Sequence, residues 1–217
     1  MGREWARETN LTLSLGDRCA FLVRSEVLVR SDGGDPGAGE VFYGDRGTNM
    51  YHVPRPLMDA VPETCPELSW GTCAIVGNSG AMLFDSLGRE IDAHDVVLRF
   101  NQAPTAGFER HVGARTMVES LNTPFARRLA DATSSEGLAG NNTRWLWRNP
   151  KTILMLFEPS KMREVYVQLR EQLPRSEVLM LGPQFIHSAM RLHEALRARL
   201  QRLGLGSMCG EKPMSGF

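Results

Sequence analysis

The chain has 217 residues and a hydrophobic fraction of 42%, which is enough for one α/β domain with a real core. Lysine plus arginine and aspartate plus glutamate number 25 each, so the composition gives no sign of a nucleic-acid or anionic-membrane partner. No segment has the unbroken apolar length of a membrane span, and the first residues lack the apolar core of a secretory signal.

The pattern over residues 1–70 is uneven. Short apolar runs at 21–23 and 27–29 stand beside a glycine-rich loop at 32–39 and four prolines between 54 and 66. Such a stretch is typical of a stem or a loosely packed lead-in. We therefore expect an irregular segment over 1–70 and a regular domain over 71–217.

From residue 71 onward, short apolar runs alternate with helical patterns. The first half predicts strands at 73–76, 96–100 and 116–121, and a helix at 81–87 that Asn78 or Ser79 caps. Charged residues at 89–95 read as a solvated or hydrogen-bonded loop.

The second half predicts strands at 152–157 and 177–181 with a helix at 161–172 between them. A long amphipathic helix follows at 185–203; on it we expect His193 to lie in the core and His187 in solvent. Strands that alternate with helices imply a mostly parallel sheet covered on both faces.

Polar turns follow the first two strands of this domain. Gly77, Asn78 and Ser79 come after the first strand, and Asn101 ends the second. At the carboxyl edge of a parallel sheet, such turns present backbone N–H groups and carboxamides to a phosphate and a ribose. An asparagine after a strand can also be a turn residue that bonds its own backbone. Asn122, which precedes Thr-Pro, is read equally well as a binding residue and as a helix or loop cap.

The four cysteines, at 19, 65, 73 and 209, are too scattered for a zinc ribbon. Buried thiols and disulfide partners both remain open. Asn10 and Asn141 each begin a glycosylation sequon, which has meaning only if the chain enters the secretory pathway.

Several segments together resemble the large sialyl motif of the eukaryotic sialyltransferases, glycosyltransferase family 29. They are Cys73-Ala-Ile-Val-Gly-Asn-Ser-Gly80, the run 88–101 that ends in Val-Val-Leu-Arg-Phe-Asn, Ala103-Pro-Thr-Ala-Gly107 and Val112-Gly-Ala-Arg-Thr116. Weaker similarity runs through 154–160 and 179–186, and Pro213-Met-Ser-Gly216 resembles the opening of the small sialyl motif. The resemblance implies a Rossmann-like sheet of the glycosyltransferase-A-like variety, covered over residues 65–217 and C-terminally incomplete.

The same resemblance implies a donor site for CMP-sialic acid, with no cofactor and no metal; the sequence has no Asp-x-Asp, which agrees with metal-independent transfer. Sialic acid would pass by inverting displacement to a galactose or N-acetylgalactosamine of a glycoprotein or glycolipid. By analogy, the donor contacts fall on seven residues: Gly77, Asn78, Ser79, Asn101, Asn122, Ser215 and Gly216. Tyr166 is a further candidate donor contact.

The family's histidine base and the disulfide partner of Cys73 would both lie beyond Phe217, so we expect no catalytic residue within the chain. The family also implies a Golgi membrane protein with a luminal catalytic domain, whereas the chain as read would be cytosolic. Two functions follow: a truncated sialyltransferase, or a nucleotide-sugar-binding remnant without transferase activity. A Rossmann dehydrogenase is disfavoured, because the chain has no Gly-x-Gly-x-x-Gly after a strand.

Overall fold

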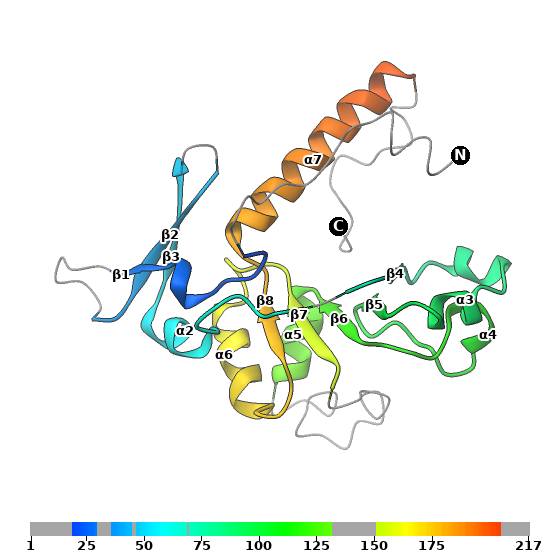
Figure 1. Ribbon diagram of the computed structural model, residues 1–217, viewed down its shortest axis with the longest axis horizontal. Helices are drawn as coiled ribbons and strands as arrows, with labels where there is room; N and C mark the ends of the chain where they lie inside the picture. Colours follow the sequence, from blue (N-terminus) through cyan, green and yellow to red (C-terminus); the bar gives the residue numbers. More distant parts are fainter. Residues whose placement is uncertain (1–18, 30–35, 45–46, 69, 132–150, 205–217) are drawn as a thin grey trace.

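The computed structural model describes residues 19–29, 36–44, 47–68, 70–131 and 151–204. Within these ranges the strands form two sheets, one of three strands and one of five (Figure 1). The smaller sheet is antiparallel, in the order β1-β2-β3, with β1 at Leu28–Val29, β2 at Gly39–Tyr43 and β3 at Asn49–Val53.

The larger sheet is parallel throughout and follows chain order from β4 to β8. Its strands are β4 (Cys73–Val76), β5 (Val96–Phe100), β6 (Val118–Leu121), β7 (Ile153–Leu156) and β8 (Val178–Met180). The α/β class and the parallel sheet predicted from the sequence are therefore confirmed. Because all five strands run the same way, the turns that follow them meet at one edge of the sheet.

Short helices follow most strands, and two of them differ from the expectation. The larger sheet carries η3 (Gly80–Phe84), α3 (Gly88–Asp92), α4 (Glu109–Val112), α5 (Thr123–Ala130), α6 (Arg163–Gln172) and α7 (Pro183–Arg202). The helix expected at 81–87 is a short 3-10 helix, η3, and Ser79 caps it by accepting a hydrogen bond from Ala81 N at 3.3 Å. The charged stretch read as a loop begins with helix α3, and the Thr-Pro after Asn122 begins α5. Proline in the first turn of a helix lacks only an N–H that has no partner there.

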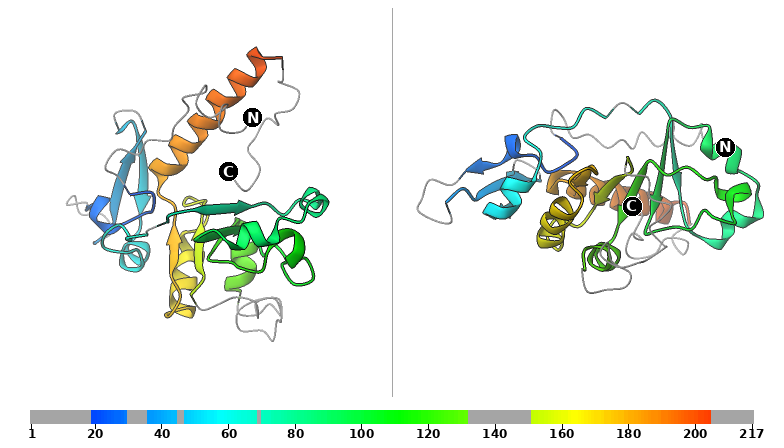
Figure 2. Two further views of the ribbon diagram at one scale, coloured as in Figure 1. Left: turned by 45° about the vertical axis from the view of Figure 1, so that its right-hand side comes forward. Right: turned by 90° about the horizontal axis from the view of Figure 1, so that it is seen from below.

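The alternation of side chains along β7 divides the core between the two faces of the sheet. Leu154 and Leu156 are fully buried in a cluster with residues of α2 (Arg55–Ala60), α5 and α6. Ile153 and Met155 point to the other face, where they pack with Leu179, Phe21 and the first turn of α7. Figure 2 shows α5 and α6 on one side of the sheet while α7 extends away on the other.

Residues 19–61 pack tightly, which differs from the loose lead-in expected there. Leu22 N donates to Met180 O at 2.8 Å, so the segment continues the sheet beside β8, after the short helix η1 (Arg24–Glu26) has been set off from it. Val53 and Leu57 are buried in the α5–α6 cluster, and Cys19 forms a disulfide with Cys65. The division of the chain at residue 70 stays a prediction. In the described ranges no helix combines the length and the apolar character that crossing a membrane requires.

Candidate functional site

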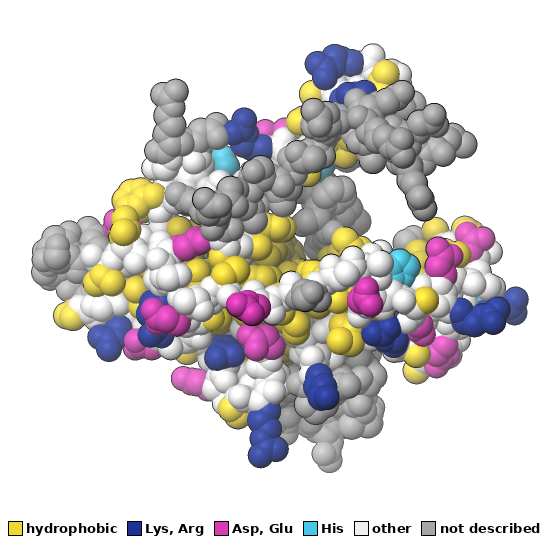
Figure 3. All heavy atoms as spheres, viewed as in Figure 1, with side chains coloured by type: hydrophobic (Ala, Val, Ile, Leu, Met, Phe, Trp, Pro, Cys, Tyr) yellow, Lys and Arg dark blue, Asp and Glu magenta, His cyan; other side chains and the backbone are white. Residues whose placement is uncertain are grey.

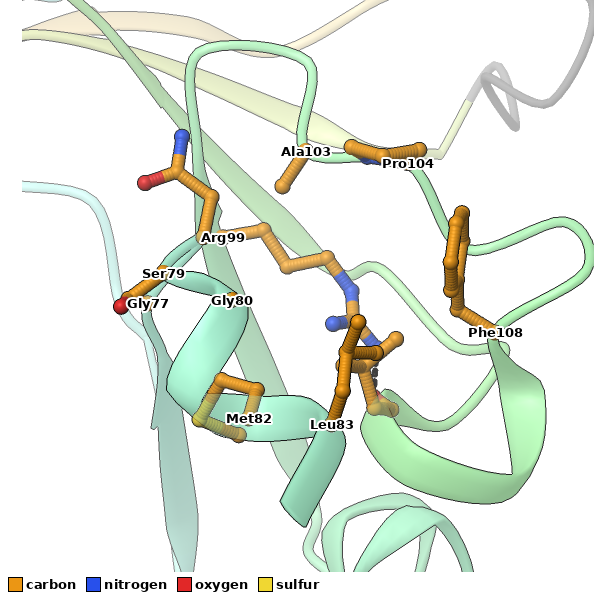
Figure 4. A pocket seen from close by; sticks show the side chains of 11 residues that line it. Gly77, Ser79, Gly80, Met82, Leu83, Arg99, Ala103, Pro104 and Phe108 are labelled. Carbon is orange, nitrogen blue, oxygen red and sulfur yellow. Dashed lines mark hydrogen bonds between the residues drawn. The ribbon is translucent and has the colours of Figure 1, made fainter.

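The turn after β4 forms one wall of a small cavity of about 150 Å³. Its lining includes Gly77, Asn78 and Ser79, together with Ala103 and Pro104 from the segment after β5. Figure 4 shows Arg99 extending from β5 between η3 and the Ala103–Pro104 segment. A Cβ atom added at Gly77 would meet no protein atom within 4 Å, so space for a ligand remains beside this backbone.

The floor of this cavity is the buried side chain of Arg99, which is 2% exposed. Its Nη2 donates to Val112 O at 2.7 Å, and its Nε donates to Arg115 O at 3.0 Å and to Thr116 Oγ1 at 3.1 Å. Burial lowers the pKa of the Arg99 guanidinium, and the nearby charge of Asp92 opposes this shift. The guanidinium donates mainly to the protein itself, so it anchors α4 against the sheet.

Asn101 follows β5 in a left-handed turn. Asn101 and Gln102 have φ angles of 52° and 60°, a conformation that costs a residue with a side chain roughly 1–2 kcal/mol. Asn101 N donates to Ser120 O at 2.9 Å, and Gln102 N donates to a carboxylate oxygen of Glu119 at 2.8 Å. These bonds hold the strained turn against the end of β6.

The structure brings Asn101 and Asn122 together. Asn101 Oδ1 accepts a hydrogen bond from Asn122 N at 2.8 Å, which links the ends of β5 and β6. Asn122 Oδ1 in turn accepts from Phe125 N at 3.1 Å and thereby caps α5. Capping, one of the two readings of Asn122, is therefore confirmed, and the same residue also lines a second, larger cavity.

These contacts fix which way both carboxamides point. A backbone N–H must meet the oxygen of a carboxamide, because the NH2 group cannot accept a hydrogen bond. In Asn101 and Asn122 the oxygen is occupied, and among the described residues neither NH2 group has a hydrogen-bond partner. This edge of the sheet therefore offers four N–H donor positions and suits a ligand rich in acceptors, such as a phosphate or a ribose.

The larger cavity, of about 800 Å³, opens beside Asn122 at the ends of β6 and β7. It is lined by the segment Phe157–Lys161, the first half of α7, and Tyr43 and Tyr51 from the small sheet. In Figure 3, hydrophobic side chains gather in the middle of the molecule below α7. The sequence alone did not assign Tyr43 or Tyr51 to a site, because only the packing of the small sheet brings them there.

The small sheet is bound to this cavity wall by specific contacts. Tyr51 Oη donates to Pro159 O at 2.7 Å and accepts from Arg163 Nε at 3.1 Å. The guanidinium of Arg163 also lies over the Tyr51 ring, 4.7 Å from its centroid. Burial raises the pKa of Tyr51 above 10.0, although the hydrogen bond and charge of Arg163 oppose the shift. Tyr51 therefore remains a neutral hydroxyl that fixes the Pro159 segment.

Glu158 is the charged group at the mouth of the larger cavity. Its carboxylate accepts from Lys161 Nζ at 2.6 Å and from Thr123 Oγ1. Burial pushes the pKa of Glu158 upward, but the hydrogen bonds from Lys161 and Thr123 and the charges of Lys161 and Arg127 outweigh burial and hold the pKa below 4.5. The carboxylate is thus ionised at neutral pH and ties the start of α5 to the end of β7.

Both histidines of α7 line this cavity, which the sequence did not predict. His187 was expected in solvent, but its Nε2 is buried and lacks a hydrogen-bond partner in the described parts of the chain. Its ring packs edge-on against Tyr43, with the centroids 5.9 Å apart. His193, expected in the core, is only partly buried. Both expectations were wrong because α7 leaves the sheet after its first turns and packs against the small sheet instead.

Other predicted residues have varied outcomes. Tyr166 is wrong as a ligand contact, because it is fully buried and donates to Val178 O at 3.1 Å. Cys73 is a free, exposed thiol, and its expected partner stays a prediction. Ser215, Gly216, Asn10 and Asn141 lie outside the described residues. No cluster of metal-ligating side chains occurs in the ranges that the structure describes.

Comparison with known proteins gives the family. The model of glycosyltransferase family 29 (sialyltransferase) matches residues 45–209. The beta-galactoside alpha-2,6-sialyltransferase 2 of Danio rerio is 32% identical over 151 residues, which are 67% of this chain and 28% of the relative. The bovine protein of the same name (Bos taurus) is 33% identical over 183 residues, 77% of this chain and 33% of the relative. The human beta-galactoside alpha-2,6-sialyltransferase 1 is 45% identical over 73 residues, 32% of this chain and 18% of the relative.

Among solved structures, a mammalian sialyltransferase crystallised with Gal-beta-1-3GalNAc-ortho-nitrophenol is 25% identical, with a TM-score of 0.47. The match covers 75% of this chain and 56% of the crystallised one. The chain belongs to glycosyltransferase family 29, the sialyltransferases. It spans a third or less of the length of these curated relatives.

Proposed function

We propose that this chain supplies the donor-binding part of a sialyltransferase that uses CMP-sialic acid. The acceptor would be a glycan that ends in galactose or N-acetylgalactosamine. The names of the relatives favour a β-galactoside acceptor and an α2,6 linkage as the first to test. The family resemblance further suggests a Golgi protein with this domain in the lumen.

One observation carries the proposal: the NH2 groups of Asn101 and Asn122 are free to donate at one edge of the sheet. The single phosphodiester and the ribose of CMP-sialic acid present acceptors and no donor-poor metal clamp is needed, since neutral N–H groups can hold one phosphate charge. The turn Gly77–Ser79 would add backbone N–H groups from the neighbouring strand. The larger cavity, with its two tyrosines, is wide enough for a sugar.

The reaction implied by the family is an inverting displacement. The acceptor oxygen forms a bond to the anomeric carbon, the bond from that carbon to the phosphate oxygen breaks, and a general base takes the hydroxyl proton. The departing CMP carries the charge that develops, and hydrogen bonds from Asn101 and Asn122 would stabilise this charge most strongly in the transition state.

The test is binding of CMP to the 217-residue chain by titration calorimetry, with UMP and AMP as controls. We expect CMP to bind and the Asn101→Ala and Asn122→Ala variants to bind at least tenfold more weakly. Equal binding of all three nucleotides, or no binding, would contradict the proposal. Transfer of sialic acid from CMP-sialic acid to a β-galactoside, followed by mass spectrometry, separates the two functions. CMP binding without transfer would favour the nucleotide-sugar-binding protein.

A further inference from the structure

Glu119 is a carboxylate in the middle of the parallel sheet. It lies in β6, is 0% exposed and is the register partner of the buried Arg99 in β5. A charged group in such a place is costly unless specific contacts compensate for the loss of water. An apolar residue would fill the same position of a buried strand at no such cost, so the contacts of Glu119 call for an explanation.

The described contact of Glu119 leads directly to the candidate donor site. Its Oε1 accepts the N–H of Gln102 at 2.8 Å, at the second residue of the left-handed turn that follows β5. Neither Asn101 nor Gln102 is a glycine, although both have positive φ angles. A hydrogen bond between a backbone N–H and a charged oxygen is stronger than one between neutral groups. The buried carboxylate can therefore hold a conformation that the residues themselves disfavour.

The turn held by Glu119 in turn positions both carboxamides. Asn101 is the first residue of the turn, and its Oδ1 accepts from Asn122 N at 2.8 Å. If the turn relaxed to negative φ angles, Asn101 would leave Asn122, and the NH2 groups of both residues would lose their fixed directions. The path runs from Glu119 through Gln102 to Asn101 and then to Asn122.

We propose that Glu119 is a positioning residue for the nucleotide donor: it does not touch the ligand, but it fixes the turn from which Asn101 does. This inference rests on the proposed function, since it assumes that Asn101 binds CMP. A purely structural role for Glu119 would lower stability without acting through Asn101, and the two roles are separable by experiment.

Two variants isolate the hydrogen bond. Glu119→Gln keeps an acceptor oxygen at the same reach, whereas Glu119→Asp keeps the charge but shortens the side chain by one methylene. We expect CMP affinity within threefold of wild type for Glu119→Gln and at least fivefold weaker for Glu119→Asp. Tyr166→Phe is the matched control: it removes a buried hydrogen bond to Val178 O, far from the turn, and should leave CMP affinity unchanged.

A double variant tests the path. In the Asn101→Ala background, Glu119→Asp should weaken CMP binding by less than twofold, because the residue through which Glu119 acts is already gone. Equal losses in both backgrounds would overturn the proposal, as would wild-type affinity in Glu119→Asp.

Amide hydrogen exchange provides a readout that needs no ligand. In Glu119→Asp the amides of Gln102 and Asn122 should exchange at least tenfold faster, while amides in α6 keep their wild-type rates. Unchanged rates at Gln102 and Asn122 would refute the positioning role even if CMP binding fell. If the wild-type chain does not bind CMP, the proposed function fails, and the exchange rates alone still decide whether Glu119 holds the turn.

Discussion

Asn122 has two roles in the structure, and substitutions at this residue can separate them. Its oxygen caps α5 through Phe125 N, while its NH2 group faces the larger cavity edge as a donor. Asn122→Ala removes both groups. Asn122→Asp retains a capping oxygen but replaces the donors with negative charge, which the N-terminal end of a helix tolerates well.

The expected magnitudes differ between stability and binding. Loss of an N-cap costs about 1 kcal/mol, so Asn122→Ala should lower the free energy of unfolding by about that amount. A hydrogen bond to a charged phosphate contributes about 1.5–3 kcal/mol, so the same variant should bind CMP about 10- to 150-fold more weakly. Asn122→Asp should keep its stability within about 0.5 kcal/mol, yet lose affinity about 100-fold or more, because its charge repels the phosphate.

Urea unfolding followed by tryptophan fluorescence measures the first quantity, and titration calorimetry with CMP measures the second. The reasoning is refuted if Asn122→Asp binds CMP as tightly as wild type. It is refuted equally if Asn122→Ala loses stability but keeps its CMP affinity, because Asn122 would then be a helix cap and nothing more.

Two further predictions concern stability. The disulfide between Cys19 and Cys65, 46 residues apart, restricts the unfolded chain and should stabilise the fold by about 4 kcal/mol, so a Cys65→Ser variant should show a correspondingly lower urea midpoint; a difference below about 1 kcal/mol would contradict this. Glu158 has a folded-state pKa below 4.5, so its stabilising contribution is complete above pH 4.5 and is lost as the pH falls through the folded-state pKa. The free energy of unfolding should therefore decline less steeply between pH 5 and pH 3 in Glu158→Gln than in wild type, and parallel pH profiles would disprove the assignment.

Local sequence signals were sufficient for the strands of the larger sheet. Val96–Phe100 was predicted with its observed bounds, because a buried parallel strand is a short apolar run between polar turns. The helices were harder. α3 was missed because its charged residues resemble a solvated loop, and its apolar contact is reduced to Ile91 among a few neighbours. Helix α5 was missed although Asn122-Thr-Pro is a start signal, since the same residues were equally consistent with a loop.

The candidate site divides in the same way. The sequence by itself determined the parallel sheet and the polar residues at the ends of β4, β5 and β6, because strand period and turn chemistry are local properties. Only the tertiary structure decided that Asn101 bonds Asn122, that Glu119 holds Gln102, and that Tyr51 reaches Pro159 across 108 residues. These contacts join residues on different elements, so they depend on how strands register and sheets pack, and no periodicity within one segment encodes that arrangement.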